Sequence, residues 1–532
     1  MSEFRRSLPR ASFDLAIVGG GVHGLFAALE AARRGWKVVL VERDDFGSGL
    51  SFNHQRTVHG GLRALQSGGI ARTRQQVAER RAWAVMVPHL VRPLPFLLPT
   101  GGGVMRSRAV IGTALRLYEW LGAGKNQGLP PALQLPPARL VSRLEALARF
   151  PGLDDTGVTG AAVWYDYQLR HPDRFNWVLA SAAIRAGASL LNYVEAIEPL
   201  RVGSRLAGLR VRDALSGIEG ELHASRVLLC AGAGSASLFE RWQLGAFPPL
   251  VRACNVLLNR PAHDTALAAR GRSGRMLTAT PWDGLWLVGT FQTDEPAAPA
   301  AAVPSRADVE AMLDDANSAF PSLKATLDDV RLVHAGLTPA TWRRGRAELL
   351  PESSVRVHGG GLYSIVGVKF TTARLTALDA LDRIGLGPQR HAPRTGRVPQ
   401  PLPHGSADGA AERLAEACRS VGVSLDPDVH AHLLDWYGTE AADVVRFSAA
   451  AARLQRLSAG LPLLEGELIY AVEQARACRL ADVVLRRTHL GTTGDPGHGA
   501  LDRAADILAT HLSWSAERRD EEVRLTRLRW AV

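Results

Sequence analysis

A short apolar run that opens into a glycine-rich turn near the N-terminus constrains the fold of this chain more than any other feature. Residues 13–18 are largely apolar, and three glycines follow them in G-x-G-x-x-G spacing, Gly19, Gly21 and Gly24. Residues 22–34 carry apolar side chains at helical spacing, and residues 36–41 are again largely apolar. Strand, turn, helix and strand form a βαβ unit, which predicts a parallel sheet.

The glycine spacing predicts a dinucleotide site. Gly19 allows the tight turn, Gly21 lets the backbone approach a pyrophosphate, and Gly24 lets helix and strand pack closely. The start of the helix offers free N–H groups and the positive end of the helix dipole to phosphates. Glu42 closes the second strand, where a carboxylate accepts hydrogen bonds from the adenosine ribose.

The segment after Glu42 favours FAD over a nicotinamide cofactor. Residues 43–69 form a long loop with many small and polar side chains. A nicotinamide-binding domain would return directly to its next helix, whereas this chain is expected to run along an extended cofactor.

The remaining sequence predicts more than one domain. A chain of 532 residues is too long for a single compact core. Residues 226–236 and 362–372 are expected to add strands to the first sheet. Residues 385–409 are rich in proline, glycine and arginine and predict a linker, and residues 411–532 have an almost entirely helical pattern.

Charge and cysteine content limit the partners. The net charge of +11 comes mostly from arginines spread along the chain, and a solvated surface is the ordinary explanation for it. An anionic substrate or a peripheral membrane contact stays open as a function of this charge. Nucleic acid is the least favoured partner. The sequence contains no apolar run of about 18 residues, so no membrane-spanning helix is predicted. Four scattered cysteines predict neither disulfides nor a metal site, which fits a cytoplasmic protein, with a peripheral position on the inner face of the membrane left open.

Five segments match one known family in order along the chain. They are residues 46–63, ending in His59-Gly60-Gly61-Leu62-Arg63, and residues 88–100, 280–290, 367–374 and 461–491. Together they resemble the FAD-dependent glycerol-3-phosphate dehydrogenases over nearly the whole chain. The fold class that the resemblance implies is α/β: a Rossmann-like FAD-binding domain with an inserted β-rich substrate domain (residues 13–385), a linker (386–409) and a C-terminal all-helical domain (410–520).

The resemblance also implies the chemistry. A small-molecule alcohol, such as glycerol-3-phosphate, a related polyol phosphate or a hydroxy acid, would give hydride to flavin N5 while a base takes the hydroxyl proton, and a quinone or oxygen would accept the electrons. Arg63 and Lys369 match family residues near the flavin and the substrate phosphate. The cofactor contacts expected on this basis are Gly19, Gly21, Gly24, Glu42, Arg43, Gly60, Gly61, Gly232, Gly367, Lys369 and Thr371.

The chain departs from the family pattern where the substrate is expected. Leu337 stands in place of a phosphate-binding arginine, and no second arginine is found in residues 351–354. Losing bidentate arginine contacts weakens phosphate binding. The arginines at 343, 344 and 346 are nearby candidates to replace them.

A different base is also needed, because Asn255 aligns with the family's candidate base histidine. His334, His59 and His54 are the alternatives, since an imidazole is suited to proton abstraction near neutral pH. Two other functions stay open: an amino-acid or amine oxidase-like flavoenzyme, and a flavin-binding protein that has lost catalysis. The oligomeric state is not predicted.

Overall fold

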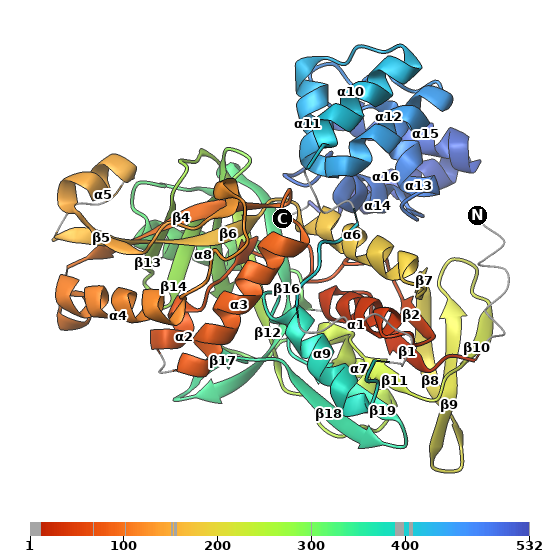
Figure 1. The fold of residues 1–532 in the computed structure, drawn as a ribbon, viewed down its shortest axis with the longest axis horizontal. Coiled ribbons are helices and arrows are strands. Elements are labelled where there is room, and N and C mark those ends of the chain that lie inside the picture. Colours follow the sequence, from red (N-terminus) through yellow and green to blue (C-terminus); the bar gives the residue numbers. More distant parts are fainter. Residues whose placement is uncertain are drawn as a thin grey trace.

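The computed structural model describes residues 12–66, 69–101, 103–150, 153, 157–298, 301–388, 398–403 and 408–530. It has three parts: a parallel sheet with helices, a large mostly antiparallel sheet, and a bundle of helices at the C-terminal end (Figure 1). The predicted fold class is therefore confirmed.

The first part contains the predicted βαβ unit, with β1 at Leu15–Val18, α1 at Val22–Arg33 and β2 at Val38–Glu42. Its sheet has the order β18-β19-β11-β1-β2-β7, and all neighbours are parallel except β18 and β19. The later strands are β7 (Ser189–Asn192), β11 (Val227–Leu229), β18 (Ser354–Gly359) and β19 (Leu362–Val366). The expected return of β11 and β19 to the first sheet is thus confirmed.

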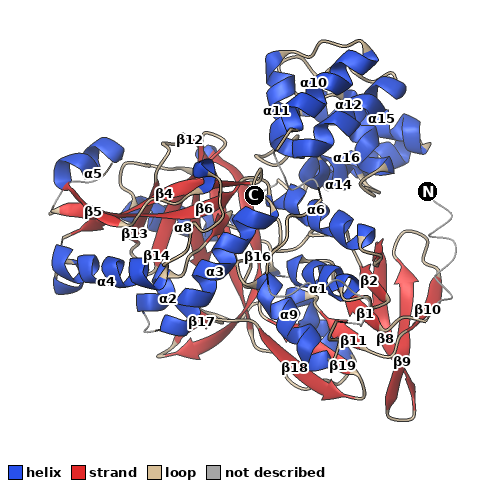
Figure 2. Ribbon diagram, viewed as in Figure 1, coloured by secondary structure: helices blue, strands red, loops and turns tan. Residues whose placement is uncertain are grey.

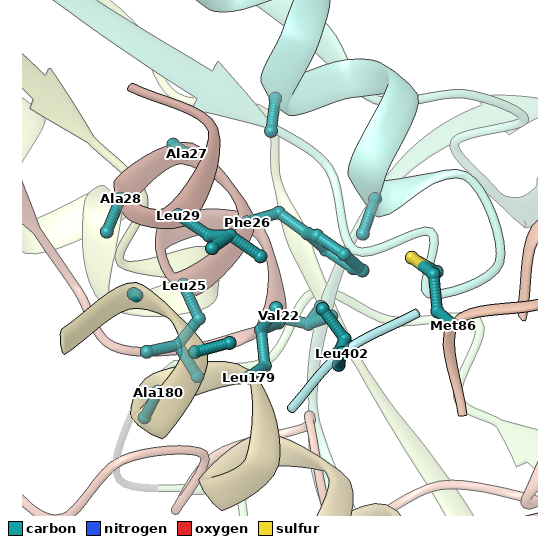
Figure 3. Close-up of a cluster of buried hydrophobic side chains, with 14 of the residues drawn as sticks. Val22, Leu25, Phe26, Ala27, Ala28, Leu29, Met86, Leu179, Ala180 and Leu402 are labelled. Carbon is teal, nitrogen blue, oxygen red and sulfur yellow. The ribbon is translucent and has the colours of Figure 1, made fainter. Parts of the chain in front are cut away.

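Helix α1 is buried because helices cover it on the side away from the sheet. Its Leu25 and Phe26 pack with Leu179 of α6 (Pro172–Arg185) and with Met86, which ends α3 (Ile70–Met86) (Figure 3). Helix α9 (Ala373–Ile384) lies beside α1. This packing fixes the start of α1, where the glycine turn lies.

The inserted part is the β-rich domain that the sequence predicted. Its sheet has the order β17-β16-β12-β15-β14-β13-β4-β6-β3, with β5 paired to β6. The strands are β3 (Thr57–Val58), β4 (Val91–Thr100), β5 (Arg139–Ser142), β6 (Gly160–Leu169), β12 (Leu250–Pro261), β13 (Ala266–Arg270), β14 (Met276–Trp282), β15 (Leu285–Gln292), β16 (Val330–Arg343) and β17 (Arg346–Leu349). Helices α2 (Leu62–Gln66), α4 (Arg108–Leu121), α5 (Arg143–Arg149) and α8 (Arg306–Ala319) accompany it.

A three-stranded sheet extends the first part, formed by β8 (Val194–Val202), β9 (Arg205–Asp213) and β10 (Glu219–His223), and α7 (Ser235–Arg241) follows β11. The C-terminal part consists of helices, as Figure 2 shows, among the residues the structure describes. They are α10 (Ala410–Val421), α11 (Pro427–Tyr437), α12 (Ala441–Ala450), α13 (Glu465–Glu473), α14 (Leu480–Asp482), a π-helical turn (Val483–Arg487), α15 (His498–Leu512) and α16 (Ala516–Arg527). No described helix combines the length and the apolar character needed to cross a bilayer.

The segment predicted as a linker is anchored to the core at two described positions. Leu386 and Leu402 are both buried in the core around α1. The carbonyl of Leu386 accepts a hydrogen bond from Arg34 at 2.7 Å, and the N–H of Leu402 donates to Met86 at 2.9 Å. A sequence without apolar periodicity can still place single leucines in a core. The domain boundaries themselves stay a prediction.

Candidate active site

The glycine turn has the close backbone contacts that its spacing predicted. A Cβ built on Gly24 would overlap the carbonyl oxygen of Gly19, so helix and strand cross as closely as glycine permits. Gly19 has φ of +108°, and a Cβ there would lie 2.6 Å from the carbonyl oxygen of Cys230 on the neighbouring strand. A Cβ on Gly21, in contrast, meets only the hydroxyl of Ser51, at 3.1 Å. Gly21 therefore faces open space on the side where a pyrophosphate would approach.

Glu42 and Ser51 shape the two sides of this turn. The carboxylate of Glu42 accepts the N–H of Gly20 at 2.7 Å and that of Asp44 at 2.9 Å, which leaves lone pairs for a ribose. Burial raises the pKa of Glu42, and these backbone hydrogen bonds partly offset the rise. Ser51, which sequence reasoning missed, accepts the N–H of Val22 at 2.9 Å and so occupies the first free donor of α1.

A cavity of about 940 Å³ runs from this turn towards the β-rich domain. Its wall contains seven of the residues predicted from the sequence, Gly19, Gly21, Glu42, Arg43, Gly232, Gly367 and His334. These come from segments more than 300 residues apart in the chain, so the fold brings the dinucleotide turn and a candidate base to one cavity.

His334, on β16, lines the cavity and lies opposite Asn255 of β12 in the sheet register. Its Nδ1 is buried and has no hydrogen-bond partner. Burial lowers the pKa of His334 well below its usual value, and the charge of Arg56 lowers it further. The imidazole is therefore neutral and able to accept a proton.

Arg56 lies near His334 and places a cation in the same part of the cavity wall. Its guanidinium lies 3.4 Å from the centre of the Trp282 ring and donates to the carbonyl of Arg170 at 2.9 Å, while its Nε has no partner. Burial lowers the pKa of Arg56 to about 10, so it remains charged near neutral pH. The side chain of Asp173 lies 3.8 Å away and leaves the charge only loosely paired.

His54, the third histidine considered, is less suited to act as a base. Its Nδ1 already accepts the N–H of Arg56 at 2.9 Å, so the proton resides on Nε2. Burial lowers the pKa of His54 to about 3, and the charge of Arg56 contributes. His54 is therefore a buried neutral donor beside Phe370, whose ring centre is 4.3 Å away.

The departures from the family pattern fall on this same region. Leu337 lines the cavity, so an apolar side chain stands where the resemblance implies an arginine. Asn255 has no basic atom, and its Oδ1 accepts the hydroxyl of Thr290 at 2.9 Å. The hairpin arginines do not replace the missing one: Arg343, Arg344 and Arg346 are exposed around the β16–β17 turn and are absent from the cavity wall.

The structure places the remaining predicted residues beside the cavity rather than in its wall. His59 is half-exposed, and its Nδ1 lies 3.3 Å from Asp166. The backbone N–H of His59 donates to the hydroxyl of Thr371 at 3.2 Å. Lys369 follows Gly367 by two residues, and its backbone N–H donates to the hydroxyl of Ser353 at 3.4 Å. Arg63 lies in α2, and its side chain is outside the described residues.

The two glycines of the His-Gly-Gly motif have a packing role in the structure. A Cβ on Gly60 would overlap the guanidinium of Arg80 and the hydroxyl of Tyr118. Arg80 and the N–H of Gly60 both donate to Asp166, at 2.6 and 2.8 Å. Gly61 has φ of +87°, a conformation that favours glycine. Their contact with a cofactor stays a prediction.

The C-terminal helices, which the sequence predicted as a separate domain, also line the cavity. Arg479, Asp482, Arg486 and residues of α16 belong to its wall. Arg486 and Arg487 form buried ion pairs with Asp45, which lies three residues after Glu42. Sequence reasoning missed these residues, because two arginines in a helical segment carry no local sign of a partner elsewhere.

The residues present fit FAD. The open face of Gly21, the free acceptor capacity of Glu42 and the neutral imidazole of His334 belong to the wall of one cavity. Gly21 would face the pyrophosphate, Glu42 would accept the adenosine ribose, and the part of the wall with His334 would receive the reacting end.

Comparison with known proteins agrees with this site. The family described as FAD dependent oxidoreductase matches residues 14–379, and the C-terminal domain of alpha-glycerophosphate oxidase matches residues 401–519. The chain is 32% identical to a glycerol-3-phosphate dehydrogenase of Mycobacterium leprae, covering 96% of this chain and 87% of the relative, and 26% identical to one of Synechocystis, covering 97% and 96%. The glycerol-3-phosphate dehydrogenase of Bacillus halodurans, solved with FAD, has the same fold, with a TM-score of 0.74, 22% identity and coverage of 98% and 95%.

Proposed function

This chain belongs to the FAD-dependent oxidoreductase family, and from that membership we propose that it oxidises the alcohol carbon of a small anionic hydroxy compound. This class includes glycerol-3-phosphate, related polyol phosphates and hydroxy acids. The observation that carries the proposal is the neutral imidazole of His334, which lines the same cavity as the glycine turn. Removing a hydroxyl proton requires such an acceptor.

The residues around His334 support an anionic alcohol as substrate. FAD, when bound, supplies the two-electron acceptor for the carbon-bound hydrogen. His334, whose imidazole is neutral, takes the hydroxyl proton. Arg56 attracts the negative group and, because it lies near His334, also keeps that imidazole neutral before the substrate arrives.

An anaerobic flavin-reduction screen tests this proposal. Polyols, polyol phosphates, hydroxy acids and amino acids are each mixed with the oxidised enzyme, and bleaching of the flavin band is followed. We expect bleaching only with alcohols that carry an anionic group. Bleaching by amino acids alone would favour an amine oxidase-like activity, and a flavin that no compound reduces would favour a protein without catalysis.

We expect glycerol-3-phosphate to reduce the flavin slowly. Leu337 offers no charge-assisted hydrogen bond to a phosphate dianion, and the nearby hairpin arginines face solvent. Lys369 is expected to hold the anion of the true substrate, so Lys369→Ala should lower the rate of reduction at least about tenfold (about 1.4 kcal/mol or more). Stopped-flow reduction measures both effects. Rapid, saturable bleaching by sub-millimolar glycerol-3-phosphate would contradict the first.

We also propose a peripheral contact with an anionic membrane through the surface around α4. Trp120 is 65% exposed and Val104 79% exposed, and Leu117 on the same helix and Ile70 on the neighbouring α3 are also exposed. Exposed arginines border these side chains, Arg74, Arg106 and Arg116. Helices α4 and α5 lie at the left of Figure 1, away from the C-terminal helices. Apolar side chains with bordering arginines are typical of helices that lie in a lipid interface.

Trp120→Glu is expected to weaken binding to vesicles that contain phosphatidylglycerol by on the order of tenfold, because the indole would no longer enter the interface. Vesicle co-sedimentation at low salt gives the affinity. Val202→Glu is the control, since Val202 is 75% exposed on the β8–β9 hairpin, outside this surface. Equal binding of the wild type and Trp120→Glu to the vesicles would contradict the proposal.

The electron acceptor, a quinone or oxygen, stays a prediction.

A further inference from the structure

The C-terminal domain reaches the end of β2 through a buried cluster of four charged side chains. Arg487 donates to both carboxylate oxygens of Asp45, at 2.9 and 2.7 Å. Arg486 donates to the same carboxylate at 2.7 Å and to Asp482 at 2.6 Å. All four side chains are more than nine-tenths buried, and two carboxylates balance two guanidinium groups. Removing one member of such a cluster leaves an unpaired buried charge.

The local backbone explains how two consecutive arginines reach one carboxylate. In a regular α-helix neighbouring side chains diverge by about 100°, because the helix has 3.6 residues per turn. Here Val483–Arg487 forms a π-helical turn, which ends with both arginines. Such turns are rare and occur frequently at functional sites. The irregular turn therefore serves the contact with Asp45.

Asp45 is connected to the glycine turn by a short, continuous set of contacts. Gly47 donates its N–H to the carbonyl of Gly20 at 2.9 Å. The ring of Phe46 lies 2.8 Å from where a Cβ on Gly20 would be. Gly20 in turn donates to Glu42. Residues 42–47 and the glycine turn thus form one unit, and the C-terminal arginines hold that unit from outside.

The cluster also borders the space where the cofactor lies. Asp45, Asp482 and Arg486 belong to the cavity wall together with Glu42. Tyr193, another residue of the wall, donates its hydroxyl to Asp482 at 2.7 Å. The adenosine end of the cavity is therefore built jointly by the FAD-binding domain and the C-terminal domain.

We propose that Arg486 and Arg487 are positioning residues of the FAD site, so that FAD affinity depends on the docked C-terminal domain. They act by fixing Asp45 and with it the loop of residues 42–47, which carries the ribose acceptor Glu42. The proposal rests on FAD binding and not on the proposed substrate. A wrong substrate class would leave it intact, because its test measures cofactor affinity.

Arg487→Met tests this role against a matched control. Arg174→Met removes another buried arginine that joins the same two domains, but its partner Glu440, unlike Asp45, lies outside the cavity wall. Both variants are stripped of FAD and titrated with it, and the thermal midpoint is recorded. We expect a lower midpoint in both variants. Only Arg487→Met should raise the FAD dissociation constant, by about tenfold or more, while Arg174→Met stays within about twofold of the wild type.

A second measurement uses the wild type alone, in case Arg487→Met does not fold. If the cluster aids FAD binding, FAD must stabilise the cluster by the same free energy. Hydrogen exchange of the stripped and reconstituted protein should therefore show slower exchange at residues 479–492 with FAD. Equal FAD affinities of the two variants, or exchange at residues 479–492 that FAD leaves unchanged, would overturn the proposal.

Discussion

Gly21→Val is expected to give a folded protein without flavin. Gly21 has φ of −77° and ψ of 179°, which valine adopts without strain, and its Cβ would meet only the hydroxyl of Ser51. The branched side chain would instead occupy the space through which the pyrophosphate approaches the N–H groups of α1. We expect the purified variant to be colourless and its FAD dissociation constant to rise by several orders of magnitude.

The absorption ratio of flavin to protein, together with circular dichroism, checks this result. Gly499→Val is the control, because a Cβ at Gly499 in α15 meets nothing within 4 Å. Gly24→Ala is a second comparison with a different outcome. Its Cβ would overlap the backbone of Gly19, so we expect loss of stability as well as of FAD. A yellow Gly21→Val protein with normal FAD affinity would contradict the assignment of the pyrophosphate site.

His334→Gln is expected to lower the rate of flavin reduction by about a hundredfold to ten-thousandfold (about 2.7–5.5 kcal/mol). Glutamine has a similar size and no basic nitrogen, so the hydroxyl proton would have no acceptor. FAD affinity should be largely unchanged, because His334 takes no part in the glycine turn or in the contacts of Glu42. Single-turnover reduction by the substrate that the screen identifies measures the rate.

His54→Gln is the matched control, since His54 is a partly buried histidine close to His334 that uses its Nδ1 lone pair for the backbone N–H of Arg56. It should retain most of the activity.

The pH dependence of the rate of flavin reduction gives a further check on His334. The pKa of His334 is lowered, so its neutral form persists as the pH falls through 6.5. The rate should therefore stay constant through that range and decline only at lower pH. A His334→Gln enzyme within about threefold of the wild-type rate would exclude His334 as the base.

The fold was predictable wherever local pattern and backbone geometry agree. The first βαβ unit follows from apolar periodicity and from glycine positions that backbone contact demands, as Gly24 and Gly19 illustrate. The return of β11 and β19 to the sheet was also predictable, because both are apolar strands running into small residues. Leu386 and Leu402 were not, since single anchors in an irregular segment have no period.

The site was predictable only in part, for a physical reason. Glu42 is fixed by its position at the end of a strand, so spacing alone locates it. His334 was one of three histidines, and the structure favours it because it alone of the three lines the cavity, which depends on tertiary contacts. The role of Arg56 comes from burial beside Trp282, a residue 226 positions later. Long-range pairs of this kind leave no trace in local sequence.

The pairing of Asp45 with Arg486 and Arg487 has a consequence for biosynthesis. These partners lie 441 and 442 positions after Asp45 in the chain. At about 5–20 residues per second, the ribosome adds them roughly 20–90 s after Asp45. Throughout that interval the nascent chain carries a glycine turn whose supporting loop is not yet fixed. Cofactor loading is therefore expected to follow chain release, and chains that terminate before Arg486 should accumulate without flavin.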